Sequence, residues 1–146
     1  MKPGQTLQFK DRGERVDKGF FVHGLWTNSE DAFVHARDTT KLDDYVGMVY
    51  LAREVYVIAN RTALKKGARV YVTRDEEAVP ETYRGQDLHV DGRGRTYFLL
   101  EEPRLYYIIQ NENFSPHEIR LYSSSSGDAI NSFAFGNLCL SEFEHL

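Results

Sequence analysis

A polar segment between residues 75 and 91 carries the side chains best suited to holding a ligand. Tyr83 offers an aromatic ring, Arg84 and Gln86 offer hydrogen-bond donors, and Asp87 offers acceptors. Carbohydrates need such a combination, because they present apolar ring faces together with hydroxyl groups. We therefore expect these four residues to form a ligand-binding loop. The alternative is that Tyr83 packs back onto the sheet.

Trp26 is the only tryptophan in the chain. With Asn28 and Glu30 close by in sequence, its ring is a second candidate platform for a sugar. A position in the core is the favoured alternative, because Trp26 follows Gly24-Leu25 in an apolar run and tryptophan is commonly buried in such strands.

Three acidic residues raise the question of calcium. Asp87, Asp91 and Glu30 offer the hard oxygen ligands that calcium prefers. Residues 87–92 contain acids and a glycine but lack the spacing of an EF-hand loop. A structural calcium is therefore the one cofactor that we consider. The five histidines show no zinc-binding spacing, so no zinc site is expected.

No sequence motif points to a catalytic nucleophile. The Gly-x-Ser-x-Gly pattern is absent, and the single cysteine, Cys139, lies between two leucines, where a buried and inert thiol is expected. A Ser-His-Asp group assembled by folding stays open, so a small hydrolase or isomerase is the least favoured function. We predict that the chain is not an enzyme.

Composition narrows the classes of partner. The 146 residues carry a formal net charge of −4, whereas nucleic-acid binders need a basic surface to meet phosphates. No run approaches the roughly 18–20 apolar residues of a membrane-spanning helix. Residues 1–5 lack the apolar core of a signal peptide. We expect neither a nucleic-acid partner nor membrane insertion.

Short runs rich in Val, Tyr and Phe alternate with turn residues, which is typical of an all-β sandwich or barrel. The chain length predicts one domain over residues 1–146. Arg53-Glu54 should mark a bulge or a tight link between two strands. The expected strands cover residues 20–26, 46–58, 68–73, 96–100, 105–109, 117–122 and 132–135.

Alternation of period two is clearest near the C-terminus. Ile119 and Leu121 share one face of a strand, and Phe133 and Phe135 share one face of the next. The serine-rich stretch between them has the composition of a turn. We predict a hairpin whose two apolar faces enter the core.

Two segments are less regular. Residues 29–37 fit either a short helix that begins at Ser29 or a strand, and we favour the strand. Residues 75–91 contain Pro80, Gly85 and many polar side chains, so we predict a long loop with little regular structure.

Several stretches, taken in order, resemble the C-terminal domain of DipZ-type and related thioredoxin-like thiol–disulfide exchange proteins. They are Gly24-Leu25-Trp26 with Glu30, and residues 50–58, 69–72, 85–88, 91–92, 103–106, 117–121 and 132–136. One departure is Arg74-Asp75-Glu76, which stands where the family often has Asp-Gly. It puts the turn geometry at Asp75 in question, because Glu76 takes a positive φ less easily than glycine.

The resemblance implies an antiparallel β-sandwich of the jelly-roll, galactose-binding-like type, joined to a thioredoxin-like domain in a parent protein. It also implies an extracytoplasmic or periplasmic setting and carbohydrate or another cell-envelope ligand as partner. The redox half of such proteins depends on cysteines that this chain lacks. We predict a non-catalytic accessory module; the alternative is a protein-interaction domain that positions a redox partner.

Overall fold

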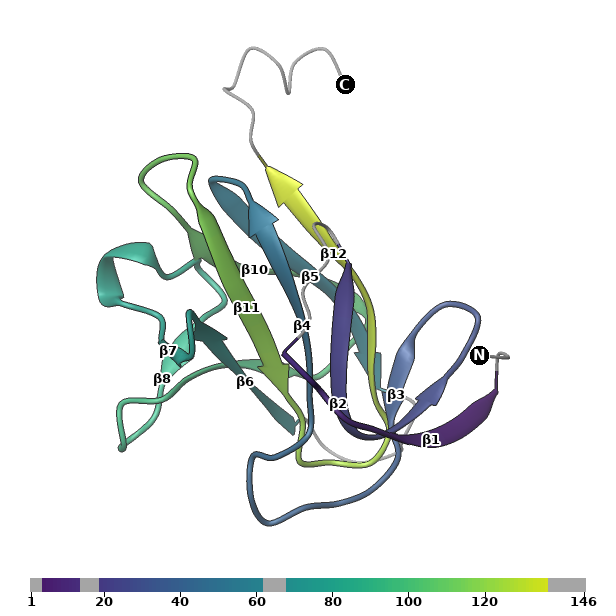
Figure 1. Cartoon of the computed structure of the whole chain (residues 1–146). Coiled ribbons are helices and arrows are strands. Elements are labelled where there is room, and N and C mark those ends of the chain that lie inside the picture. Colours follow the sequence, from purple (N-terminus) through teal and green to yellow (C-terminus); the bar gives the residue numbers. More distant parts are fainter. Residues whose placement is uncertain (1–3, 14–18, 62–67, 137–146) are drawn as a thin grey trace.

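The computed structural model describes residues 4–13, 19–61 and 68–136. Their regular structure consists of antiparallel strands and one three-residue 3-10 turn, η1 (Glu81–Tyr83) (Figure 1). None of these residues belongs to a helix that is long and apolar enough to cross a membrane. The strands are β1 (Gln5–Phe9), β2 (Phe20–Asn28), β3 (Phe33–His35), β4 (Tyr45–Leu51), β5 (Glu54–Arg61), β6 (Ala68–Arg74), β7 (Glu77–Ala78), β8 (His89–Val90), β9 (Thr96–Leu100), β10 (Arg104–Gln110), β11 (Pro116–Tyr122) and β12 (Asp128–Gly136).

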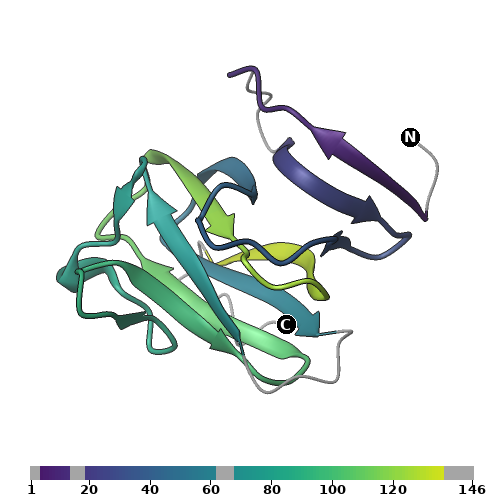
Figure 2. The ribbon, with the colours of Figure 1, turned by 90° about the horizontal axis from the view of Figure 1, so that it is seen from below.

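The strands form two layers that share β2 (Figure 2). Sheet A has the order β10-β5-β12-β3-β2, with β1 beside β2. Sheet B continues from β2 in the order β4-β11-β6-β9-β8, with β7 beside β6. The predicted all-β, antiparallel sandwich is confirmed, whereas its jelly-roll connectivity stays a prediction.

The core takes alternate residues from strands of both sheets. Val46 and Met48 of β4 are buried together with Val55 and Val57 of β5. The link between these strands is the two-residue step Ala52-Arg53, so the predicted tight connection at Arg53-Glu54 is confirmed. Because β4 lies in sheet B and β5 in sheet A, this short link carries the chain across the sandwich.

The predicted C-terminal hairpin is wrong, although the inward faces of its strands are right. Ile119 and Leu121 are fully buried, and Phe133 and Phe135 pack against the same core. However, β11 pairs with β4 and β6, whereas β12 pairs with β5 and β3. The serine-rich connection crosses between sheets, and the two apolar faces meet across the core instead of lying side by side.

A buried polar network holds that crossing. Asp44, just before β4, accepts two hydrogen bonds from Arg37 (2.6 and 2.7 Å) and one from His35 Nε2 (2.7 Å). The other ring nitrogen of His35 lies 3.0 Å from Ser123 Oγ, which donates to Asp128 (2.8 Å). Burial alone would raise the pKa of Asp44, but the bonds from Arg37 and His35 lower it, so the carboxylate stays charged.

Gly24 lets β2 serve both sheets. Residues 20–23 pair with β4, and residues 24–28 pair with β1 and β3. Gly24 lies at the change of direction with a φ of 106°, a region that residues with a side chain avoid. A Cβ at this position would also overlap the carboxyl group of Asp44. Glycine is therefore required both by the bend and by the buried network.

The two irregular segments largely follow their predictions. Residues 29–37 contain the strand β3, preceded by a turn in which Ser29 Oγ bonds the backbone of Ala32. Residues 75–91 contain only β7, β8 and η1. The turn between β6 and β7 has positive φ at Asp75 (54°) and Glu76 (67°). The chain thus adopts the glycine-type turn without glycine, at a cost of roughly 1–3 kcal/mol per residue.

Replacing Asp44 should test the buried network. Asp44→Ala leaves Arg37 and His35 without their shared acceptor, so we expect a loss of about 3–5 kcal/mol in the free energy of unfolding. The matched control is Asp43→Ala, because Asp43 is the exposed neighbour and should change stability by less than about 0.5 kcal/mol. Denaturant titration of both variants would measure the difference; equal losses would show that the network contributes nothing.

Candidate functional site

The loop predicted to bind a ligand is fastened to the edge strand β10. Arg84 forms a bridge with Ile109, and the backbone N–H groups of Gly85 and Asp87 donate to carbonyls of β10 (both 3.0 Å). A Cβ on Gly85 would lie 2.5 Å from the carbonyl oxygen of Tyr107, so this close approach needs glycine. The loop therefore lies along the β10 edge of sheet A.

The four candidate residues of this loop do not point toward one common site. Asp87 accepts from Arg104 (2.9 and 3.2 Å) and from the backbone N–H of Tyr107 (2.8 Å); these bonds outweigh burial and lower the pKa of Asp87. Arg84 donates to the carbonyl of Val79 (3.0 Å). Gln86 is exposed, and Tyr83 is half-buried under the guanidinium of Arg74 (4.5 Å). Arg84 and Asp87 therefore stabilise the loop, whereas Tyr83 lines a separate pocket with Arg74.

The prediction that Trp26 is a platform for a sugar is wrong. Its side chain is fully buried, its Nε1–H donates to the carbonyl of His23 (2.9 Å), and its ring packs against His35 (4.8 Å). A ring without exposed surface cannot stack on a sugar. The alternative core position is confirmed.

The three calcium candidates also lie apart. Glu30 is exposed in the β2–β3 turn, and Asp87 is bound to Arg104. Asp91 caps the β8–β9 turn by accepting from the backbone of Arg93 and Arg95, both at 2.9 Å. Within the described ranges, no three His, Cys, Asp or Glu side chains lie close enough to hold a metal ion. Cys139 lies outside those ranges.

The outer face of sheet B carries a feature that the loop prediction missed. Six aromatic residues stand directly opposite one another across six strands, one residue per strand. Adjacent strands are about 4.8 Å apart, so the row spans about 24 Å across the sheet. We call these residues the aromatic row: His23, Tyr45, Tyr122, Tyr71, Tyr97 and His89.

The rings form two groups. The first contains His23, Tyr45 and Tyr122, with ring centroids 5.3 and 5.1 Å apart. The second contains Tyr71, Tyr97 and His89, with spacings of 5.5 and 5.6 Å. Tyr45 and Tyr71 are 9% and 8% exposed, whereas the other four rings present more surface to solvent.

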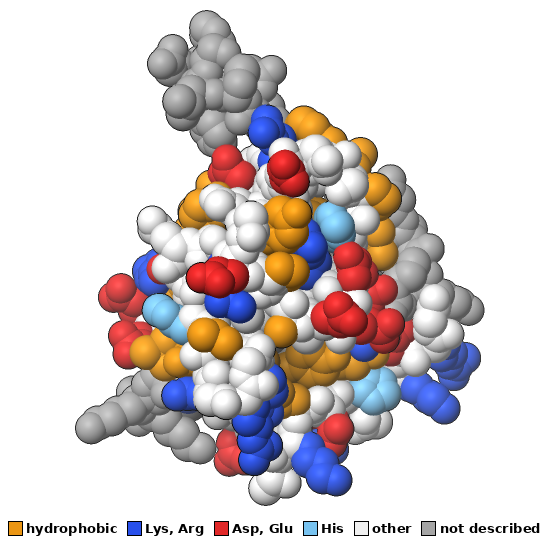
Figure 3. Space-filling view, turned by 90° about the vertical axis from the view of Figure 1, so that its left-hand side faces the viewer, with side chains coloured by type: hydrophobic (Ala, Val, Ile, Leu, Met, Phe, Trp, Pro, Cys, Tyr) orange, Lys and Arg blue, Asp and Glu red, His pale blue; other side chains and the backbone are white. Residues whose placement is uncertain are grey.

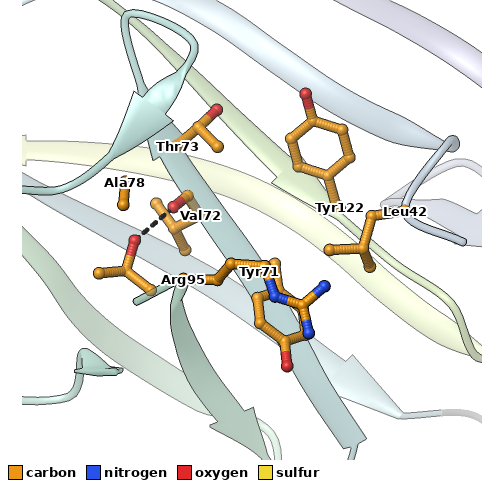
Figure 4. A pocket seen from close by; sticks show the side chains of 8 residues that line it. Leu42, Tyr71, Val72, Thr73, Ala78, Arg95 and Tyr122 are labelled. Atoms are coloured by element: carbon orange, nitrogen blue, oxygen red, sulfur yellow. Dashed lines mark hydrogen bonds between the residues drawn. The ribbon is translucent and has the colours of Figure 1, made fainter. Parts of the chain in front are cut away.

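A pocket of about 170 Å³ lies between the two groups (Figure 4). Tyr122 and Leu42 stand on one side, and Tyr71, with the guanidinium of Arg95 4.6 Å from its ring centre, stands on the other. Thr73 lines the pocket with a buried hydroxyl that has no hydrogen-bond partner among the described residues. The pocket thus joins aromatic edges to a polar atom that still needs a partner.

Arginines lie over the rings of the row. The guanidinium of Arg120 is 4.6 Å from the ring centre of Tyr45, and that of Arg69 is 4.3 Å from Tyr97. Arg120 also pairs with Glu118 (2.7 Å) and Glu76 (3.1 Å), which offset its charge. The surface is therefore aromatic and polar without a strong excess of positive charge.

Comparison with known proteins identifies the family of this chain. A family model described as a thioredoxin-like C-terminal domain matches residues 1–136. The chain belongs to this family. A search of curated proteins finds no match. This match confirms the expected association with thioredoxin-like proteins.

The aromatic row could be predicted only in part from the sequence. Tyr122 shares a strand face with Glu118 and Arg120, opposite Ile119 and Leu121, so its outward position follows from alternation. The row itself depends on which strands are neighbours and in which register. Because β4, β11 and β6 are adjacent in space but distant in sequence, alternation alone could not reveal it.

The Asp91 turn predicts an acid-sensitive contribution to stability. Although desolvation opposes it, hydrogen bonds from Arg95, Arg93 and Tyr71 lower the pKa of Asp91 to about 2. An unfolded Asp titrates near 3.9, so this contribution is complete above about pH 4 and is lost as the pH falls toward 2. Asp91→Asn keeps an acceptor oxygen but removes the charge.

The difference in melting temperature between the parent domain and Asp91→Asn should therefore shrink between about pH 4 and pH 2. Thermal unfolding followed by circular dichroism at several pH values would measure it. Asp44 and Asp87 titrate in both proteins, so their effects cancel in the difference. A constant difference over this range would contradict the assignment.

Proposed function

We propose that this domain is an accessory module of a DipZ-type thioredoxin-like thiol–disulfide exchange protein and that it binds carbohydrate along the aromatic row. Family membership supports the association with a thioredoxin-like domain. The sequence supports the accessory role, because its one cysteine cannot supply a dithiol pair. The extracytoplasmic setting implied by the DipZ resemblance would bring the domain to cell-envelope glycans.

The in-register aromatic row is the observation that carries the carbohydrate proposal. A row of about 24 Å across a sheet matches an extended chain molecule better than a single small ligand. Sugar rings have apolar faces that pack on aromatic side chains and hydroxyl groups that exchange hydrogen bonds with Tyr and Arg. The four more exposed rings of the aromatic row, with the arginines beside them, offer both kinds of group along one line.

The pocket between Tyr122 and Tyr71 would hold one sugar unit more firmly than the rest of the row. A sugar hydroxyl in this pocket would supply the missing partner of Thr73 Oγ1. Arg95, held over Tyr71 and paired with Asp91 (2.9 Å), would present further donors at the rim.

The charge distribution favours a neutral chain over a polyanion. Arg120 and Arg95, which lie over the aromatic row, already pair with carboxylates. On the face that forms the left-hand side of the molecule in Figure 1, acidic and basic side chains are interspersed with hydrophobic ones (Figure 3). Nucleic acids need a concentrated basic surface, which this arrangement does not provide.

A second surface favours the alternative function of contacting a protein partner. Phe20 is 49% exposed and packs against Phe33 (6.2 Å) and Phe133 (5.8 Å), while Phe9 lies 6.1 Å from Phe33. Exposed aromatic clusters are common at protein interfaces. This cluster would suit a thioredoxin-like domain, and it does not depend on the aromatic row.

Tyr122→Ala tests the carbohydrate proposal. Tyr122 borders the pocket and belongs to the row, so its removal should weaken glycan binding at least tenfold, or about 1.4 kcal/mol. The control is Tyr107→Ala, which removes a comparable half-buried tyrosine from the outer face of sheet A. A glycan array would select the ligand, and calorimetry would measure the affinity of each variant.

Two results would contradict the proposal. One is that no cell-envelope glycan binds the parent domain at concentrations up to the millimolar range. The other is that Tyr122→Ala and Tyr107→Ala bind with equal affinity. Either result would leave the phenylalanine cluster around Phe20 as the better candidate for the functional surface.

A further inference from the structure

A second group of chemically competent side chains lies at the opposite end of β11 from the aromatic row. Ser115, in the loop before β11, has its Oγ 2.9 Å from Nε2 of His117. The other ring nitrogen, Nδ1, lies 2.6 Å from Oδ2 of Asp75 in the β6–β7 turn. The three side chains therefore form a continuous chain of hydrogen bonds that links the start of β11 to the β6–β7 turn.

The hydrogen bonds fix the direction in which a proton would move. An ionised carboxylate only accepts hydrogen bonds, so Nδ1 of His117 donates to Asp75. In the neutral imidazole, Nε2 is then the acceptor, and the hydroxyl group of Ser115 donates a hydrogen bond to it. A serine nucleophile, a histidine base and an acid that orients the base require this arrangement.

The strained turn holds the acid in place. Asp75 has a positive φ, and its backbone N–H donates to the carbonyl of Glu118 (2.8 Å), while the N–H of Glu118 donates to Asp75 Oδ1 (2.9 Å). Glu76, the second residue with a positive φ, pairs with Arg120. These bonds to β11 leave Oδ2 of Asp75 aimed at His117. Backbone strain of this kind is concentrated at functional sites.

Ser115 and His117 open into a pocket of about 130 Å³, a volume suited to a small acyl group. Both residues are partly exposed, so a substrate can reach them. Arg74 brings a positive charge into the pocket; it donates to Asn111 (2.6 Å) and lies 4.5 Å from the ring centre of Tyr83. A cation that lines the same pocket as a serine nucleophile is suited to stabilising a developing oxyanion.

The chain also contains a Ser-His-Asp group that cannot react with a substrate. Ser123, His35 and Asp44 make similar contacts, but they are 1%, 1% and 0% exposed inside the sandwich. That group belongs to the buried network of Asp44 inside the sandwich. Access to a pocket is what distinguishes Ser115 from Ser123.

We propose that Ser115 and His117 are catalytic residues that hydrolyse esters of small acyl groups, and that Asp75 is the positioning residue. This activity goes beyond the proposed carbohydrate binding and departs from the sequence-based prediction that the chain is not an enzyme. From the sequence, a Ser-His-Asp group assembled by folding is possible, but its members cannot be assigned.

The reaction balances with water as the only co-reactant. Ser115 Oγ attacks the ester carbonyl carbon while His117 Nε2 takes the hydroxyl proton. The tetrahedral intermediate collapses, the bond to the alcohol oxygen breaks, and His117 returns the proton to the departing alcohol. Water then attacks the acyl-serine while His117 takes a proton from it. The bond between the acyl carbon and Ser115 Oγ breaks, His117 returns the proton to Oγ, and the carboxylic acid leaves.

The test uses hydrolysis of p-nitrophenyl acetate by the full chain. We expect saturable hydrolysis, and Ser115→Ala and His117→Ala should each reduce kcat/KM at least 100-fold. Asp75→Asn should lower kcat at least tenfold while KM changes little, because it affects the orientation of the base and not the pocket. Ser124→Ala, a serine substitution in a different loop, should leave the rate unchanged.

Covalent labelling provides a readout that is independent of turnover. A small fluorophosphonate should modify Ser115 and not Ser123, as identified by peptide mass spectrometry, and His117→Ala should abolish the labelling. Circular dichroism would establish that each variant is folded. The proposal is overturned if the parent chain shows no saturable hydrolysis, if Ser115→Ala keeps the parental rate, or if Ser115 is not labelled. None of these outcomes bears on glycan binding at the aromatic row.

Discussion

The buried carboxylate of Asp44 is the interaction on which the arrangement of the two sheets depends. It gathers Arg37 and His35 at the point where the chain passes from β3 to β4. Its backbone carbonyl accepts from the N–H of Ser123, which ties in the crossing from β11 to β12 (3.1 Å). Asp44 thus joins two places where the chain changes sheets, and the burial of its carboxylate is tolerated because Arg37 and His35 donate hydrogen bonds to it.

The positions of the surface groups follow from these crossings. Because β2 bends at Gly24 over Asp44, its first half extends sheet B and places His23 beside Tyr45. Because β11 is the central partner of β4 and β6, it brings Tyr122 between Tyr45 and Tyr71. The proposed binding surface and the proposed ester-hydrolysing group lie at opposite ends of this one strand.

Local patterns were enough to predict most of the longer strands and their buried faces, as with Ile119 and Leu121, but they did not predict β1. They were not enough to predict pairing, which is why a hairpin was expected where β11 and β12 separate into different sheets. The site residues show the same limit. Tyr83 was correctly placed in an irregular loop, but the loop uses its polar neighbours, such as Asp87, to bind β10. The partners of His117 depend on tertiary contacts between residues far apart in sequence.

The order of strands also has a consequence for synthesis of the chain. Of the strands that the structure describes, the two that come last in the chain lie in the interior of the sheets: β11 between β4 and β6, and β12 between β5 and β3. Until they leave the ribosome, β4 and β5 lack neighbours on one side and expose unpaired backbone and apolar side chains. Such long-range pairing also makes folding slow compared with that of helical domains of equal size. A nascent chain that has not reached β11 is therefore the state of this domain most exposed to aggregation.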